Sequence, residues 1–211
     1  MSQYFNFHRL AMSLTLLATI ALGSAAVAKA DVYQITTSNF AGNQNFGSIT
    51  TTLVGTSIRV DLVLTPGFVL HGQGIGFNVV DPDGVVTVSN ISNPAFAPPL
   101  GSGNMDGFGA FAYQLGGPST AQARAGNFNT LTFTVSSTRP GGFTNANQLA
   151  ELNAAGFLFA VQIAPLDTGA ATGFAAVPGG TTPVPEPTSM ILLGSGLVGL
   201  ATGVRRKLKK K

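Results

Sequence analysis

Cysteine and tryptophan are absent from the 211-residue sequence, and only 9% of its residues are charged. Without cysteine the chain has no disulfide, although export would permit one. Histidine is almost as scarce, since His8 and His71 are the only two, and this composition cannot supply the usual ligands of a zinc site. We therefore expect a domain held by its apolar core alone, with no metal and no cofactor.

Basic residues are scarce between the two ends of the chain. Over residues 31–183, three arginines stand against seven carboxylates, a net charge of −4, and the formal +3 of the whole sequence comes from its ends. Phosphate recognition requires clustered cations on the folded domain. The composition therefore predicts that nucleic acid is not a partner.

The first thirty residues have the order of a secretory signal peptide. Arg9 precedes the apolar run 10–22, and small residues follow it, with Ala28 and Ala30 in the positions of an A-x-A cleavage site. Cleavage is predicted between Ala30 and Asp31. A permanent N-terminal anchor, the alternative, requires a longer apolar run than this one.

The C-terminal end joins an uncharged apolar segment to a cluster of cations. Residues 188–204 form the segment, and six cations follow, beginning with Arg205, Arg206 and Lys207. As a helix the segment spans about 25 Å, the short limit for a hydrocarbon core of about 30 Å. The cations are expected to stop transfer and remain cytoplasmic, which leaves everything before Thr188 outside. A buried core helix, the alternative, does not usually end in a block of like charge.

A proline-rich motif, Val184-Pro185-Glu186-Pro187, stands directly before the apolar segment. The order of motif, Gly-rich apolar helix and basic tail resembles the PEP-CTERM sorting signal of Gram-negative bacteria. The resemblance implies processing by an exosortase, a membrane cysteine protease that cuts near the motif and passes the protein to the cell surface. The prolines themselves hold the chain extended and keep it out of helices, as a protease substrate requires. A plain proline-rich linker is the alternative.

The region between the two signals repeats apolar residues with a period of two, which predicts half-buried strands. Turn residues such as Pro66-Gly67 separate the runs. The pattern favours an all-β fold, an antiparallel β-sandwich or jelly roll. The predicted strands are 32–37, 48–54, 58–64, 74–80, 85–91, 107–114, 130–135, 156–163 and 173–177.

One hairpin and one helix can be predicted in more detail. A two-residue II′ turn at Gly55-Thr56 places Leu53 opposite Ile58, with both side chains buried, and leaves Arg59 and Asp61 on the other face. The single helix is predicted to run from a cap at Thr144 or Asn145 to residue 155, with Leu149 and Leu152 on one face, Glu151 within it and Gly156 as its stop.

Few side chains suggest catalysis. His71, beside Gly72, is interpreted as a solvated loop histidine, and a Ser-His-Asp triad around it is the alternative, although no G-x-S-x-G pattern is present. Asp81 and Asp83 suggest a turn, with a calcium site as the alternative. Exposed Tyr33, Phe111 or Tyr113 would indicate a polysaccharide-binding face. The chain is therefore not expected to be an enzyme.

Together these features predict an exported, non-enzymatic surface or matrix protein with a role in biofilm or exopolysaccharide. The precursor is expected to be anchored in the inner membrane with its ectodomain in the periplasm, and the mature form to lie at the cell surface or outside the cell. Predicted partners are the exosortase, the inner membrane and, in the mature form, exopolysaccharide or other surface proteins. A binding module for polysaccharide or another ligand, an uncleaved single-pass membrane protein and a secreted enzyme are the rival hypotheses. The predicted segments are the signal peptide 1–30, the ectodomain 31–180, the proline-rich linker and motif 181–187, the transmembrane helix 188–204 and the basic tail 205–211.

Overall fold

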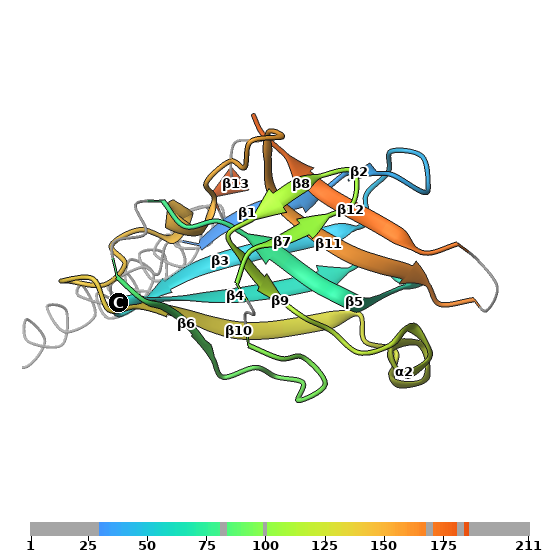
Figure 1. Cartoon of the computed structure of the whole chain (residues 1–211), viewed down its shortest axis with the longest axis horizontal. Helices are drawn as coiled ribbons and strands as arrows, with labels where there is room; N and C mark the ends of the chain where they lie inside the picture. The colour runs from blue at the N-terminus through green and yellow to red at the C-terminus, as the bar shows by residue number, and fades with distance from the viewer. Residues whose placement is uncertain (1–29, 81–83, 99–100, 168–170, 181–183, 186–211) are drawn as a thin grey trace, which may run out of the picture.

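The computed structural model describes residues 30–80, 84–98, 101–167, 171–180 and 184–185 (Figure 1). Every pairing between named strands in these ranges is antiparallel, and one isolated parallel bridge joins Asn78 to Ala150, so the predicted all-β class is confirmed. The strands are β1 (Ala30–Ile35), β2 (Thr37–Ser38), β3 (Gly47–Val54), β4 (Ser57–Leu64), β5 (Phe68–Phe77), β6 (Val86–Ser89), β7 (Gly103–Met105), β8 (Gly109–Phe111), β9 (Tyr113–Leu115), β10 (Thr130–Ser137), β11 (Phe157–Pro165), β12 (Gly173–Pro178) and β13 (Val184–Pro185).

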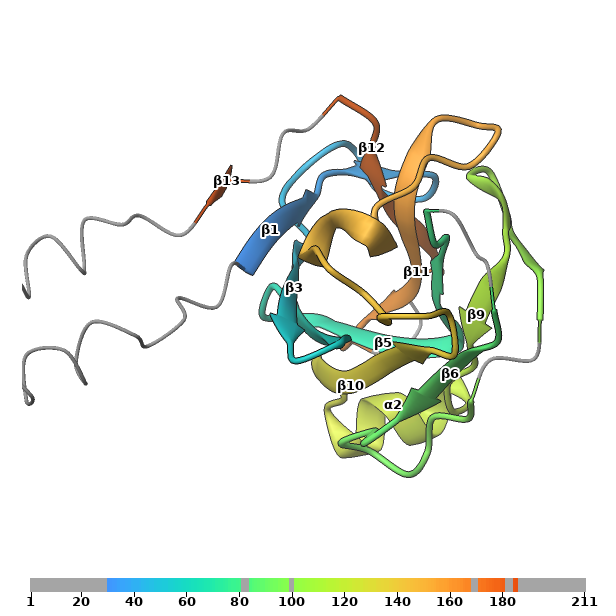
Figure 2. The ribbon, with the colours of Figure 1, turned by 90° about the vertical axis from the view of Figure 1, so that its left-hand side faces the viewer.

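The strands form two large sheets and a small one. Sheet A has the order β13-β1-β3-β4-β10-β6, sheet B has the order β2-β12-β11-β5-β9, and β7 and β8 make a separate hairpin. The chain passes from sheet A to sheet B between β1 and β2, where the Thr36 amide donates to the Ala176 carbonyl over 3.1 Å. The view in Figure 2 shows the strands arranged around one interior.

A single apolar core joins the two sheets. Ile49, Ile58 and Phe133 enter it from sheet A, and Ile75 and Phe77 enter it from sheet B, all with 1% exposure or less. The rings of Phe77 and Phe133 meet across the interior, with centroids 6.1 Å apart. Burial of large apolar side chains is the main source of stability in a chain without disulfides.

The outer face of sheet B is covered as well. Met105, Phe108 and Phe111 from the β7–β8 hairpin region pack on Ala160 and Phe174 of β11 and β12. Farther along the same face, the helix α2 (Thr120–Gly126) buries Ala123 against Val69 and Ala164. Sheet B is therefore a middle layer over much of its extent.

The predicted hairpin register is correct. Leu53 lies opposite Ile58, and Thr51 lies opposite Val60. Gly55 adopts a φ of +63° whereas Thr56 does not have a positive φ, as a II′ turn requires. Burial agrees for Ile58 but not for Leu53, which is only half-buried because it lies near the turn, at the end of the sheet.

The predicted helix is wrong in length and the true α-helix was missed. Residues 146–149 form a single 3-10 turn, η1 (Ala146–Leu149), which Asn145 and Gln148 close with a capping box. Leu152 is exposed, and Gly156 ends a turn rather than a helix. Among the described residues the α-helix is α2, where Ser119 and Gln122 form the capping box and Asn127 caps the C-terminus in the left-handed region.

Candidate functional site

The first half of the proline-rich motif is an edge strand of sheet A. β13 pairs antiparallel with β1, so that Asp31 lies opposite Pro185 and Val32 opposite Val184 (Figure 2). Proline lacks a backbone donor and is tolerated at the edge of a sheet rather than in its middle. The motif begins, therefore, as an extended segment held against the folded domain.

The start of β1 coincides with the predicted signal-peptide cleavage site. Ala30 is the first residue of the strand and lies opposite Thr52 of β3, and Asp31 follows it opposite Thr51. Because β1 and β13 are antiparallel, the end of β1 that joins residue 29 is the end at which the chain continues past Pro185. The two predicted processing sites thus share one corner of sheet A.

Several predicted residues lie outside the described ranges. They are the signal segment with Ala28, the motif residues Glu186 and Pro187, the apolar segment 188–204, the basic residues Arg205, Arg206 and Lys207, and the turn residues Asp81 and Asp83. Among the described residues, no helix has the length and apolar character needed to cross a membrane.

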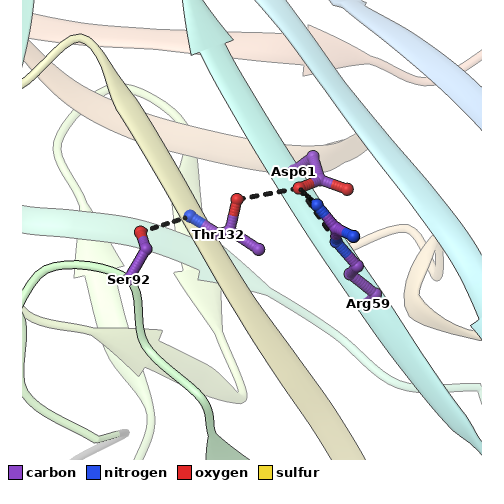
Figure 3. Close-up of polar contacts among 4 residues, drawn as sticks. All are labelled: Arg59, Asp61, Ser92 and Thr132. Atoms are coloured by element: carbon purple, nitrogen blue, oxygen red, sulfur yellow. Dashed lines mark hydrogen bonds and ion pairs between the residues drawn. The ribbon is translucent and has the colours of Figure 1, made fainter.

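A polar network lies on the outer face of sheet A (Figure 3). The Asp61 carboxylate accepts hydrogen bonds from the Arg59 guanidinium at 2.8 Å and from the Thr132 hydroxyl at 2.8 Å. The Thr132 amide in turn donates to the Ser92 hydroxyl over 2.9 Å. The Arg59 side chain is 55% exposed and that of Asp61 is 28% exposed, so the ion pair contributes little stability and mainly orders the face.

Hydroxyl side chains surround this network in regular rows. Thr50 and Thr132 flank Asp61 on the neighbouring strands, and Thr52 and Thr134 flank Arg59. One row farther along, the Ser57 and Ser136 hydroxyls share a hydrogen bond of 2.9 Å. The outer face of sheet A is consequently a hydroxyl-rich surface without net charge at its centre.

His71 is not the solvated loop residue that its neighbour Gly72 suggested. It lies within β5, is 4% exposed, and its Nδ1 is 3.1 Å from the hydroxyl of Thr120 on α2. Its Nε2 is buried without a hydrogen-bond partner. A hydroxyl thus takes the position that the orienting carboxylate of a Ser-His-Asp triad would occupy.

The surroundings of His71 favour its neutral form. Burial lowers the pKa of the imidazole below its usual value, the backbone of Ile163 opposes this shift, and the positive charge of Arg124 lowers the pKa further. The Arg124 guanidinium also donates to the Pro165 carbonyl over 3.0 Å, which ties α2 to β11. The contacts of His71 and Arg124 fasten the helix to sheet B.

The aromatic candidates for a ligand-binding face point into the fold. Tyr33 and Phe111 are each 1% exposed, and Tyr113 is partly buried with its ring stacked on Phe77 at a centroid distance of 5.6 Å. Burial raises the pKa of Tyr33 to about 12, with the Asp31 charge adding to the shift and the Thr51 hydroxyl opposing it. In the described ranges no aromatic side chain is exposed.

Acidic groups are dispersed over the described part of the chain. Glu151 is exposed in the irregular segment after η1, whereas the sequence predicted it within a helix. Within the described ranges no three histidine or carboxylate side chains gather in a way that could hold a metal ion.

Thr120 and Thr132 were not identified as site residues from the sequence, although local patterns place both of them in their elements. Thr120 directly follows Ser119, which forms a capping box with Gln122, a pattern that marks the start of a helix. Thr132 alternates with buried Leu131 and Phe133 and belongs to the polar face by its period. Its contact with Asp61 is a pairing between distant strands and has no local signal.

Comparison with known proteins bears on the C-terminal end. Residues 183–207 match the family model of the PEP-CTERM protein-sorting motif. No curated protein and no solved structure matches the chain. The resemblance of the motif, apolar segment and basic tail is thereby confirmed, and β13 is the described part of the matched region. The chain therefore carries a PEP-CTERM protein-sorting motif, the signal that marks a protein for export and exosortase processing.

Proposed function

We propose that the chain is the precursor of a non-enzymatic scaffold protein of the cell surface or extracellular matrix. The observation that carries the proposal is the sorting motif at residues 183–207, which directly follows a folded all-β domain. In this proposal residues 1–30 are a signal peptide, 31–180 the ectodomain, 181–187 the linker and motif, 188–204 a transmembrane helix and 205–211 a basic cytoplasmic tail.

The location of the precursor follows from the two ends. The signal peptide directs export, and the cations from Arg205 onward resist transfer, so that the ectodomain lies in the periplasm while the tail helix remains in the inner membrane. Val184, Pro185, Glu186 and Pro187 then lie just outside the bilayer, where the exosortase reads them. Removal of the helix frees the domain for the surface or the medium.

The domain itself is proposed to be a β-sandwich of the jelly-roll kind. One core shared by sheets A and B supports this assignment, together with the passage of the chain between sheets at Thr36. Such a fold is stable without disulfides or metals when its core is continuous.

A scaffold role is favoured over a polysaccharide-binding role through aromatic platforms. Binding of sugars by stacking needs exposed rings, whereas Tyr33 and Phe111 are buried and Tyr113 is packed on Phe77. The burial of His71 against Thr120 favours a structural over a catalytic use of this residue. Contact of the mature domain with exopolysaccharide or other surface proteins is assigned to the hydroxyl-rich outer face of sheet A.

The proposal is tested by replacing Glu186 in the full-length chain, in cells that carry the exosortase. Glu186→Gln should leave export intact but slow removal of the tail, so that the full-length species accumulates in the inner membrane. Glu151→Gln, at an exposed position of the domain, is the matched control and should be processed like wild type. Normal processing of the Glu186→Gln chain would leave the plain linker as the better account of the motif, whereas a tail retained by wild type in the presence of the exosortase would favour the uncleaved single-pass anchor.

A further inference from the structure

The pairing of β13 with β1 places the start of the sorting motif on the folded domain. Val184 and Pro185 are the register partners of Val32 and Asp31, and β13 is the outermost strand of sheet A. One edge of the motif is therefore covered by the domain itself. A protease that grips an extended peptide needs the backbone groups of that peptide for its own pairing.

The length of chain beside this pair limits where the domain can sit. With β13 paired, only Glu186 and Pro187 separate the sheet from the predicted membrane helix at Thr188. Two extended residues reach about 7 Å, which holds sheet A close to the bilayer. With β13 released, the eight residues 180–187 follow the last hydrogen bond of the domain, from the Gly179 amide to the Gly156 carbonyl, and fully extended they reach about 27 Å.

We infer that the β1–β13 pairing is an autoinhibitory contact that must open before the tail is removed. This inference rests on the proposed function and adds to it the element that controls access to the motif. The pairing involves two residues of β13, so it is small enough to open reversibly while sheet A, held by the longer β1–β3 pairing, stays folded. Val32 is thus a positioning residue for processing, although it lies far from the motif in the sequence.

The absence of cysteine from the chain permits a direct test. Cysteines at two directly opposed positions of an antiparallel pair lie within reach of a disulfide. The double variant Val32→Cys/Val184→Cys therefore locks β13 on β1 in the full-length chain. The matched control is Gln34→Cys/Val184→Cys, because Gln34 lies two residues farther along β1, about 7 Å beyond the opposed position and too far for a disulfide.

The measurement is tail removal over time, by intact mass, in isolated membranes that contain the exosortase. The oxidised Val32→Cys/Val184→Cys chain should keep its tail, reduction with dithiothreitol should restore removal, and the control should match wild type under both conditions. Removal from the oxidised chain at the control rate would overturn the inference while leaving the proposed function standing. Failure of the folded double variant to form the disulfide would overturn it too.

A second variant weakens the pair without a cross-link. Val32→Gly removes the side chain that stands opposite Val184, and cross-strand side-chain energies correspond to about two- to five-fold faster tail removal. An unchanged or slower rate in a folded domain contradicts the inference. If wild type itself keeps its tail where the exosortase is present, the proposed function fails, and the contact then controls nothing.

Discussion

Sheet A and sheet B use the same antiparallel pairing but differ in what covers them. Sheet A buries one face, and its other face carries rows of hydroxyl side chains around Arg59 and Asp61. Sheet B is buried on its inner face by the shared core and on much of its outer face by the β7–β8 hairpin and α2. In the described part of the chain, sheet A therefore offers a broad polar surface, whereas sheet B is covered on both faces over much of its extent.

The largest effect is expected from the two faces of one strand in sheet A. Phe133 is fully buried against Phe77 of sheet B, whereas its neighbour Thr132 lies on the outer face. Phe133→Ala should lower the free energy of unfolding by about 3–5 kcal/mol, and Thr132→Ala by about 1 kcal/mol. Urea denaturation of the ectodomain in its full-length chain measures both. Equal losses would contradict the assignment of one buried and one solvated face.

A second prediction compares two glycines with the same positive φ. Gly74 in sheet B and Gly55 in sheet A both have a φ of +63°, but a Cβ at Gly74 would collide with the Leu115 carbonyl whereas none lies near Gly55. Gly55→Ala should cost about 1–2 kcal/mol from backbone strain alone. Gly74→Ala should cost at least about 3 kcal/mol, because the pairing of β5 with β9 must shift as well.

If thermal or urea unfolding shows the same loss for both glycine variants, β9 does not pack on β5 as described. Such a result would reduce sheet B to the four strands β2, β12, β11 and β5. A larger loss for Gly74→Ala instead supports the tight layering of that sheet.

The third prediction concerns the stability of the domain at acid pH, which depends on His71 in sheet B. His71 in sheet B has a lowered pKa in the folded state, so the unfolded chain binds the proton more readily as the pH falls below about 6.5. The stability that depends on neutral His71 is thus present above that pH and is lost below it, with a slope of up to about 1.4 kcal/mol per pH unit.

Urea denaturation between pH 7 and pH 5 measures this slope, and His71→Leu is the control because it removes the proton site while preserving an apolar side chain. The variant should show a flatter profile than wild type. Identical slopes for both chains would mean that His71 is not held neutral between β5 and α2.

The sequence predicted sheet A better than sheet B for a physical reason. In strands β3, β4 and β10 buried and exposed residues alternate, because one face of the sheet contacts solvent. The sequence therefore predicted their limits, and the register of the β3–β4 hairpin, nearly to the residue. Strand β5 is buried on both faces and interrupted by Gly72 and Gly74, so its apolar residues do not alternate with polar ones. The alternation therefore predicts only the second half of this strand. His71 was misread for the same reason.

The candidate site also has one part that the sequence predicts and one part that it does not. The sorting motif is a linear signal, read from the order of neighbouring residues, and the family model confirms it at residues 183–207. Its pairing with β1 joins residues 31–32 to residues 184–185 across almost the whole domain. No local pattern specifies such a pairing, because it depends on how the rest of the sheet brings the two ends together.

The central claim is that the tail is a signal removed by a protease and not a lasting anchor. The most direct measurement is the intact mass of the protein from the cell surface and from the inner membrane, compared between cells with and without the exosortase. The account predicts a species that lacks the apolar segment 188–204 and the basic residues after it in the first case, and a full-length tail retained in the inner membrane in the second. Detection of the basic tail peptide on surface protein from cells with the exosortase would contradict it.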